Sequence, residues 1–251
     1  MGILNITPDS FSDGGKYIDI EAAVKRAKDM AQDGAHIIDI GGESTRPGYE
    51  PVDEDVEINR VVPVIERLSR EIDIPISVDT SKAAVAKKAL LAGASIVNDI
   101  WGLQKDVYLA DVVAQSGAGV VMMYNRDDKN YTDVIDEIKK FLNKSIAIAE
   151  KAGIKRSHMA IDPGIGFGKT FVHNIETLRR LDELNSLGLP VLLGTSRKSF
   201  IGKILDLTVD ERMEGTAATV ALGIAANADI MRVHDVKEMS RVARVSDAIV
   251  R

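Results

Sequence analysis

The stretch PISVDTSKAAVAKKALLAGASIVND, residues 75–99, decides the fold class. It opens with a short apolar run that ends at Asp79, continues into an alanine-rich segment, and passes Gly93 before a second apolar run. Runs of this kind, rich in Ile and Val, are typical of strands buried in a parallel sheet. The alanine-rich segment predicts a helix, and glycine accepts the left-handed turn that ends one. The stretch therefore predicts a strand, a helix and a parallel strand.

The same pattern repeats along the chain. The apolar runs are GILNI, HIIDI, PISVD, SIVND, GVVMM, MAIDP, PVLLG and DIMRV, and the expected helices cover residues 20–32, 54–70, 83–92, 107–116, 132–152, 174–187, 212–226 and 236–250. Eight such units in 251 residues predict a (β/α)8 TIM barrel. An open doubly wound sheet is the alternative, but it would favour one dominant glycine-rich turn. Without a linker or a shift in composition, we expect one domain over residues 1–251.

Composition excludes several classes of function. The net charge of −6 argues against a general nucleic-acid binder, although a local cluster of Arg and Lys could still bind an anion. The chain has no cysteine, which excludes disulfides, Cys-based zinc sites and a Cys nucleophile. No apolar run approaches the length of a membrane span, and the start of the chain does not read as a signal peptide. We therefore expect a cytoplasmic protein with no nucleic-acid or membrane partner.

Polar residues follow nearly every predicted strand. In a barrel these positions share one rim, where the active sites of such folds lie. Single residues have plainer explanations: Asp79 could equally cap the next helix, and Asp162 with Pro163 could form a turn. Asp39 and Asn125 stay ambiguous. The occurrence of so many on one rim favours a site, and the candidates are Asn5, Asp79, Asn98, Asp162, Lys198, Arg232 and His234.

Three of these candidates predict an anion site. Arg232 and His234 are two residues apart, so their side chains would share one side of the last strand, beside Asn5 of the first. Arginine and histidine donate to phosphate, and an amide oxygen can help to hold Mg²⁺. The other histidines, His36, His158 and His173, fall near strand or helix starts.

Two further segments contribute to the same rim. DPGIGFGKT, residues 162–170, is one residue too short for a nucleotide P-loop, so it is interpreted as a turn that places Phe167 over the barrel mouth. TSRKSF, residues 195–200, puts Arg197 and Lys198 at a helix start, where cations are disfavoured. We therefore expect these two side chains to meet an anionic or hydrogen-bonding group.

Taken together, seven motifs resemble the dihydropteroate synthases, the folate-pathway enzymes that sulfonamides target, and the resemblance covers essentially the whole chain in order. The motifs are NITPDSFSDGG (5–15), DIGGESTRPG (39–48), SVDTSK (77–82), NDIWG (98–102), DPGIGFGK (162–169), GTSRKSFIG (194–202) and RVHDV (232–236). The resemblance implies a transferase in which 4-aminobenzoate displaces diphosphate from (7,8-dihydropterin-6-yl)methyl diphosphate. It also implies a homodimer.

The resemblance assigns roles to residues. The pterin would be bound by Asp79, Asn98, Asp162 and Lys198, of which Asp79, Asp162 and Lys198 are the candidate catalytic residues. Asn5, Arg232 and His234 would bind diphosphate, with Mg²⁺ as cofactor near Asn5. Thr45, Arg46, Pro47, Phe167 and Ser199 would bind 4-aminobenzoate, together with Lys198. Ile100 and Met123 would either wall the pterin slot or pack in the core. Residues 5–15 would form a lid that closes with Phe11 over the aminobenzoate.

One departure and two alternatives complete the expectation. Members of the family usually carry a short hairpin before the first strand, whereas here Met1 leads straight into GILNI, so either the chain is truncated or the barrel floor is open. A pterin-binding methyltransferase, which moves a methyl group from methyltetrahydrofolate, would share the pterin residues but has no need for TSRKSF with RVHD. A non-catalytic pterin-binding module is the other alternative.

Overall fold

Parallel strands form the centre of the molecule in a computed structural model that describes residues 1–6, 16–43 and 52–251. Strands β1 to β6 pair in chain order, and β7 pairs with β8. Their bounds are β1 Gly2–Asn5, β2 Ile38–Gly41, β3 Ile76–Asp79, β4 Ile96–Asp99, β5 Gly119–Met123, β6 Met159–Asp162, β7 Leu192–Leu193 and β8 Ile230–Met231. Seven of them fall within the predicted apolar runs, and β2 extends one residue beyond HIIDI, to Gly41.

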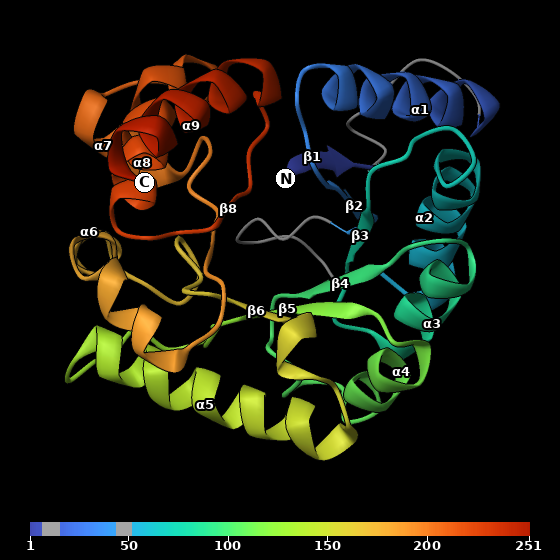
Figure 1. Ribbon diagram of the computed structural model, residues 1–251, viewed down its shortest axis with the longest axis horizontal. Helices are drawn as coiled ribbons and strands as arrows, with labels where there is room; N and C mark the ends of the chain where they lie inside the picture. Colours follow the sequence, from blue (N-terminus) through green and yellow to red (C-terminus); the bar gives the residue numbers. More distant parts are fainter. Residues whose placement is uncertain (7–15, 44–51) are drawn as a thin grey trace.

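Two backbone bridges join these sheets into a closed ring. Ile161 bridges Val191, and Gly2 bridges Val233, both in parallel. At the second bridge the N–H of Ile3 donates to the carbonyl of Val233 over 3.0 Å, and the N–H of Val233 donates to the carbonyl of Met1 over 2.9 Å. The predicted (β/α)8 barrel is confirmed, with helices forming the outer layer around the strands (Figure 1).

The helices follow the predicted pattern with local differences. They are α1 Lys16–Gln32, α2 Glu54–Leu68, α3 Ala83–Leu91, α4 Leu109–Ser116, α5 Val134–Ala152, α6 Phe171–Arg179, α7 Ser199–Leu205, α8 Met213–Ala225 and α9 Val236–Val250. Three 3₁₀ turns, η2 Arg156–His158, η3 Leu181–Leu187 and η4 Val209–Glu211, complete the set in the described ranges. The sequence indicated a helix start within residues 195–200 but gave no range for α7.

The expected helix over residues 174–187 is wrong in its bounds. It begins earlier, because the Thr170 side chain accepts a hydrogen bond from the N–H of His173 over 3.2 Å and the two residues form a capping box. It then breaks after Arg179 into η3. The early start places Thr170 directly after the segment DPGIGFGK, which ties that segment to a rigid helix.

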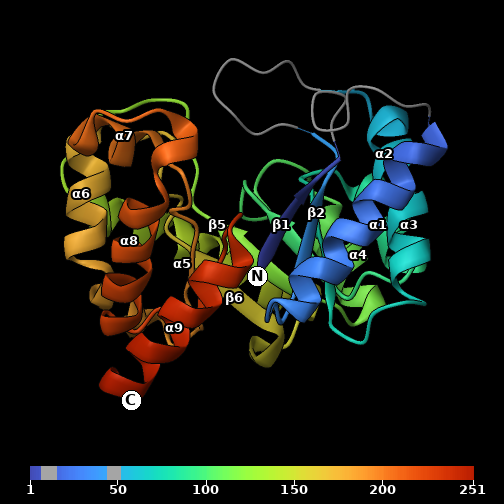
Figure 2. The same cartoon turned by 90° about the horizontal axis from the view of Figure 1, so that it is seen from above.

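The core lies between the strands and the helices. Ile38, Ile40 and Val78 on the strands are completely buried, as are Val61 and Ile65 on α2. Strands β1 and β2 run side by side in the same direction, so their carboxyl ends meet at one end of the barrel (Figure 2). That end carries the predicted site. Across the described portions of the chain, none of the helices has the length and apolar character needed to traverse a bilayer.

Candidate active site

The residues predicted for the site lie where the strands end. They are Asn5, Asp79 and Asp162 at the last positions of β1, β3 and β6, Asn98 one residue before the end of β4, Lys198 between β7 and α7, and Arg232 and His234 after β8. The barrel therefore brings together on one rim side chains that are far apart along the chain.

Arg232 is the central cation of the site. Its Nε donates to Oδ2 of Asp39 over 2.6 Å, and its Nη2 donates to Oδ2 of Asp79 over 2.6 Å. Asn98 Nδ2 donates to the same Asp39 oxygen over 3.1 Å. Asp39, which the sequence left ambiguous, is completely buried and orients both Arg232 and Asn98. The signal that could have assigned Asp39 to the site was the presence of an Asp within the apolar run HIIDI.

The alternative role of Asp79 as a helix cap does not fit the structure. The first N–H of α3, on Ala83, donates to Oδ2 of Asp106 over 2.7 Å instead. The carboxylate of Asp79 faces Arg232 across the barrel. Asp79 therefore pairs with Arg232 in the site and does not cap α3.

Burial raises the pKa of both site carboxyls, Asp79 and Asp162. It raises the pKa of Asp79 to about 7, although the Arg232 guanidinium acts to lower it. Burial also raises the pKa of Asp162, against the backbone N–H of Gly164, which donates to Oδ1 over 2.7 Å, and against Lys198. Two carboxyls of this kind can accept hydrogen bonds when ionised and donate when protonated. They suit a ligand edge that carries both donors and acceptors.

Lys198 and Phe167 lie against each other in the site. The Lys198 ammonium lies 4.4 Å from the centroid of the Phe167 ring. Burial and the charge of Arg232 lower the pKa of Lys198 to about 8, although Asp162 and Asp79 raise it. The ammonium is therefore still mostly protonated at neutral pH, and it donates from a poorly hydrated position.

His234 is held beside Arg232 by a hydroxyl. Its ring Nδ1 lies 3.0 Å from Oγ of Ser196, and its backbone N–H donates to the same Oγ over 3.2 Å. Burial, and then the charges of Arg232 and Arg197, lower the pKa of His234 to about 4. At neutral pH the ring therefore offers a neutral N–H donor and not a second positive charge.

Asn5 and Asp79 approach each other above Gly41. A methyl group built on Gly41 would lie 3.7 Å from Oδ1 of Asn5 and 3.9 Å from Oδ2 of Asp79. In the described part of the chain no group of three or more His, Cys, Asp or Glu residues could hold a metal ion. A single amide oxygen nevertheless fits Mg²⁺, which often takes only one or two protein ligands and binds mainly to substrate phosphates and water.

Several predicted residues lie outside the described ranges. Thr45, Arg46 and Pro47 fall within residues 44–51, and most of the segment predicted as a lid, including Phe11, falls within residues 7–15. Ser199, the remaining predicted aminobenzoate residue, is exposed at the first position of α7. Its role stays a prediction.

The anionic group that Arg197 meets is a carboxylate of the chain itself, Asp235. Nη2 and Nε of Arg197 donate to the two carboxylate oxygens of Asp235 over 2.6 Å and 3.0 Å. Arg197 has a φ of 58°, a left-handed conformation that is rare for an arginine. The ion pair ties the segment after β7 to the segment after β8, and Arg197 therefore supports the site from outside.

A small cavity of about 20 Å³ marks the centre of the site, with room for about one water molecule. Ile100 and Met123 line it, so the slot-wall alternative for these two residues fits the structure. The full lining is Asp79, Asn98, Ile100, Met123, Asp162, Ile165, Phe167, Gly194, Lys198 and Arg232. A flat ligand would therefore have to displace side chains, of which Arg232 and Lys198 are the longest.

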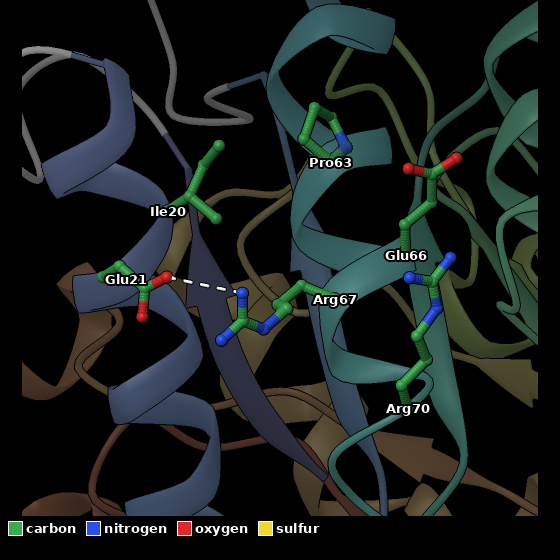
Figure 3. Close-up of a pocket in the computed structure, with 6 residues that line it drawn as sticks. All are labelled: Ile20, Glu21, Pro63, Glu66, Arg67 and Arg70. Atoms are coloured by element: carbon green, nitrogen blue, oxygen red, sulfur yellow. Dashed lines mark ion pairs between the residues drawn. The ribbon is translucent and has the colours of Figure 1, made fainter.

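A larger hollow of about 290 Å³ lies elsewhere, between α1 and α2 (Figure 3). Arg67, which lines it, already pairs with Glu21 over 3.6 Å. The other lining residues, Ile20, Pro63, Glu66 and Arg70, are not among the buried polar groups of the molecule. The hollow therefore lacks the convergent buried polar groups of the barrel mouth.

Comparison with known proteins places these features in a family. The chain matches the family described as pterin binding enzyme over residues 1–234. It is 55% identical to the dihydropteroate synthase of Bacillus subtilis over 99% of this chain and 87% of that protein. The dihydropteroate synthase of Clostridium difficile, crystallised in the presence of pteroic acid, matches with a TM-score of 0.98 and 55% identity over 100% of this chain and 96% of that one. The Xanthomonas albilineans dihydropteroate synthase, solved with 4-aminobenzoic acid, matches with a TM-score of 0.95 and 43% identity over 99% of this chain and 92% of that one. The chain belongs to the pterin-binding enzyme family, as a member of its dihydropteroate synthases.

Proposed function

We propose that this chain joins 4-aminobenzoate to (7,8-dihydropterin-6-yl)methyl diphosphate, giving 7,8-dihydropteroate and diphosphate. The chain covers 87% of the Bacillus subtilis dihydropteroate synthase and 96% of the Clostridium difficile one. The observation that carries the proposal is the cavity at the barrel mouth, where Asp79, Asp162, Asn98 and Lys198 converge. These groups are the candidates that the sequence assigned to the pterin.

The pterin ring offers an edge that these side chains can match. Its amino and ring N–H groups donate hydrogen bonds, and its ring nitrogens and carbonyl oxygen accept them. The carboxyls of Asp79 and Asp162 would accept from the donors, and Asn98 and Lys198 would donate to the acceptors. Burial of Asp79, Asn98 and Asp162 makes an unmatched ligand costly, which gives selectivity for a pterin.

The reaction then needs mainly positioning and electrostatics. The bond between the pterin methylene carbon and the diphosphate oxygen breaks, and its electron pair leaves with diphosphate. The lone pair of the aromatic amine forms the new C–N bond, and the amine proton passes to solvent. A neutral aromatic amine needs no strong base, so a site without an obvious acid–base pair is sufficient. The charge of Asp162 would stabilise the developing pterin cation.

The leaving diphosphate would be bound by Asn5, Arg232 and the neutral His234. Arg232 offers a planar set of donors, although Asp39 and Asp79 engage two of its nitrogens in this state. Mg²⁺, held by Asn5 and the diphosphate itself, would neutralise part of the leaving charge. On the other side of the pterin, Phe167 and Ser199, with Thr45, Arg46 and Pro47, would bind 4-aminobenzoate.

The direct test is the release of diphosphate by the purified protein. We expect release that requires both 4-aminobenzoate and the pterin diphosphate, with 7,8-dihydropteroate identified by mass. A thermal-shift comparison separates the methyltransferase alternative: pterin with diphosphate should stabilise this protein more than methyltetrahydrofolate does. Stabilisation by methyltetrahydrofolate alone, with no diphosphate release, would overturn the proposal.

Three further properties belong to the same proposal. The chain would form a homodimer, residues 1–251 would fold as one domain, and the protein would be cytoplasmic. A single cooperative unfolding transition would support one domain, and cell fractionation would test the location. The dimer is tested by substitution, as described in the Discussion.

A further inference from the structure

Lys169 is a buried cation that the proposed chemistry does not use. Its side chain is 6% exposed, and its Nζ donates to the carbonyl oxygens of Pro163 over 2.8 Å, Gly164 over 2.9 Å and Phe167 over 3.3 Å. The same ammonium lies 4.3 Å from the ring centroid of Tyr124. Three carbonyl groups of the preceding residues therefore surround one charge. These residues are here called the 163–168 segment.

The outer side of the 163–168 segment packs closely against the backbone of residues 124–126. Gly164 has a φ of +66°, and a Cβ there would lie 1.9 Å from the carbonyl oxygen of Tyr124. Gly168 has a φ of +54°, and a Cβ there would lie 2.4 Å from the carbonyl oxygen of Arg126. The two glycines therefore allow the segment to lie directly against the backbone of residues 124–126.

The inner side of the segment forms part of the site. The N–H of Gly164 donates to Oδ1 of Asp162 over 2.7 Å, and the Phe167 ring lies against the ammonium of Lys198. A Cβ on Gly166 would lie 3.1 Å from Cδ of Lys198. A change in the shape of the segment would thus be transmitted to Asp162, Phe167 and Lys198.

We propose that Lys169 is a positioning residue of the active site, because its ammonium fixes the 163–168 segment in the shape that presents Phe167 and Lys198 to the 4-aminobenzoate. The inference rests on the proposed function, since the ligand whose binding should change is 4-aminobenzoate. Lys169 itself lies behind the segment and does not line the cavity.

The contacts of Lys169 suit an ammonium group. Three carbonyl oxygens need three donors in a compact arrangement, which a protonated lysine supplies. Burial lowers the pKa of Lys169 to about 7, although Asp162 raises it, and Lys198 and Arg126 lower it further. Burying this cation therefore costs desolvation free energy that an apolar side chain of the same length would avoid.

The absence of cysteine in the chain allows a test with matched side chains. Lys169→Cys would be alkylated in the unfolded state with 2-bromoethylamine, which rebuilds a lysine-length ammonium, or with 1-bromopropane, which builds a neutral side chain of the same length. Each protein would be refolded, its turnover measured over a range of 4-aminobenzoate concentrations to obtain KM, and its pterin affinity measured separately.

We expect the propyl protein to show a KM for the aminobenzoate raised by about tenfold or more, with pterin affinity changed by less than about threefold. The aminoethyl protein should return to within about threefold of the wild-type KM. Equal KM values in the two alkylated proteins would show that the charge has no positioning role and would overturn the proposal.

A second variant covers the case in which the alkylated chains do not refold. Lys169→Met is expressed directly, and its crystal structure should show the Phe167 ring displaced from Lys198. Tyr131→Phe is the control, because it removes a hydrogen bond to Gly168 of the same segment and leaves the contacts of Lys169 intact. An unmoved Phe167 in Lys169→Met would overturn the inference even if the wild-type protein proved to have a different activity.

Discussion

Nη2 of Arg232 lies 2.6 Å from Oδ2 of Asp79, and this ion pair joins the end of β3 to the segment that follows β8. The same guanidinium pairs with the fully buried Asp39. One arginine therefore compensates two buried carboxylates while it also lines the ligand cavity. Its contribution to folding and its contribution to binding should be separable from those of its neighbour His234.

Arg232→Met should destabilise the fold as well as the diphosphate site. Removing one partner of a buried ion pair typically costs about 3–5 kcal/mol, because the remaining charge is left uncompensated. His234→Ala should cost far less, since the ring is neutral and, among the described residues, hydrogen-bonds only to Ser196. Urea unfolding gives the free energies, and calorimetric titration of diphosphate with pterin gives the affinities. Both variants should weaken diphosphate more than 4-aminobenzoate; equal stability of the two would contradict the structural role of Arg232.

Asp162→Asn and Lys198→Ala should each weaken pterin binding by about tenfold or more, because a lost partner leaves buried ligand groups unpaired at about 1–3 kcal/mol each. The measurement is calorimetric titration of a pterin without 4-aminobenzoate. Ser199→Ala is the matched control, because Ser199 is exposed and assigned to the other substrate. Normal pterin affinity in both variants would place the pterin elsewhere.

Lys198→Met should stabilise the free protein while abolishing its activity. The folded state lowers the pKa of Lys198 from 10.5 to about 8, so it disfavours the charged form relative to the unfolded chain. This penalty is fully present below pH 8 and disappears as the pH rises from 8 to 10.5. The variant should therefore gain about 1 kcal/mol or more at pH 7, with a gain that shrinks above pH 8. Thermal unfolding across this pH range measures it, and a gain that grows with pH would show the sign to be wrong.

The proposed dimer should depend on the helices that close the barrel. Leu222 on α8 and Val245 and Ile249 on α9 are 70%, 62% and 79% exposed. These two helices pack together at one side of the ring (Figure 1). Leu222→Glu with Ile249→Glu should give a monomer by light scattering. Leu91→Glu on α3, where the side chain is equally exposed at 77%, is the control and should leave a dimer.

Several strand ends were predictable from the sequence, because the runs GILNI, PISVD and MAIDP have a polar residue at or next to their ends and parallel strands share one rim. This is why Asn5, Asp79 and Asp162 appear where the sequence placed them. The partners of these residues were not predictable. Arg197 pairs with Asp235, and Asp39 with Arg232, across segments whose relative position depends on the closure of the barrel.

Lys169 illustrates a second limit. The segment DPGIGFGK predicted a turn that places Phe167, but no pattern in the residues indicated that Lys169 folds back on three of its own preceding carbonyls. The spacing of glycines in the sequence shows where a turn lies. Which carbonyl oxygens of that turn face the Lys169 ammonium depends on the φ of Gly164 and Gly168. Such contacts appear only when the backbone is known.

The bridge between Gly2 and Val233 also fixes when this protein can first become active during its synthesis. Strands β1 to β6 pair with sequence neighbours, and they can assemble while the rest of the chain is still on the ribosome. Arg232, however, reaches Asp39 and Asp79 only after β8 has been made and has joined β1. Until then two carboxylates are left without their cation. A nascent chain that stops before β8 would therefore carry most of a barrel with a substrate site that lacks Arg232 and His234, and it would present its open edges to chaperones.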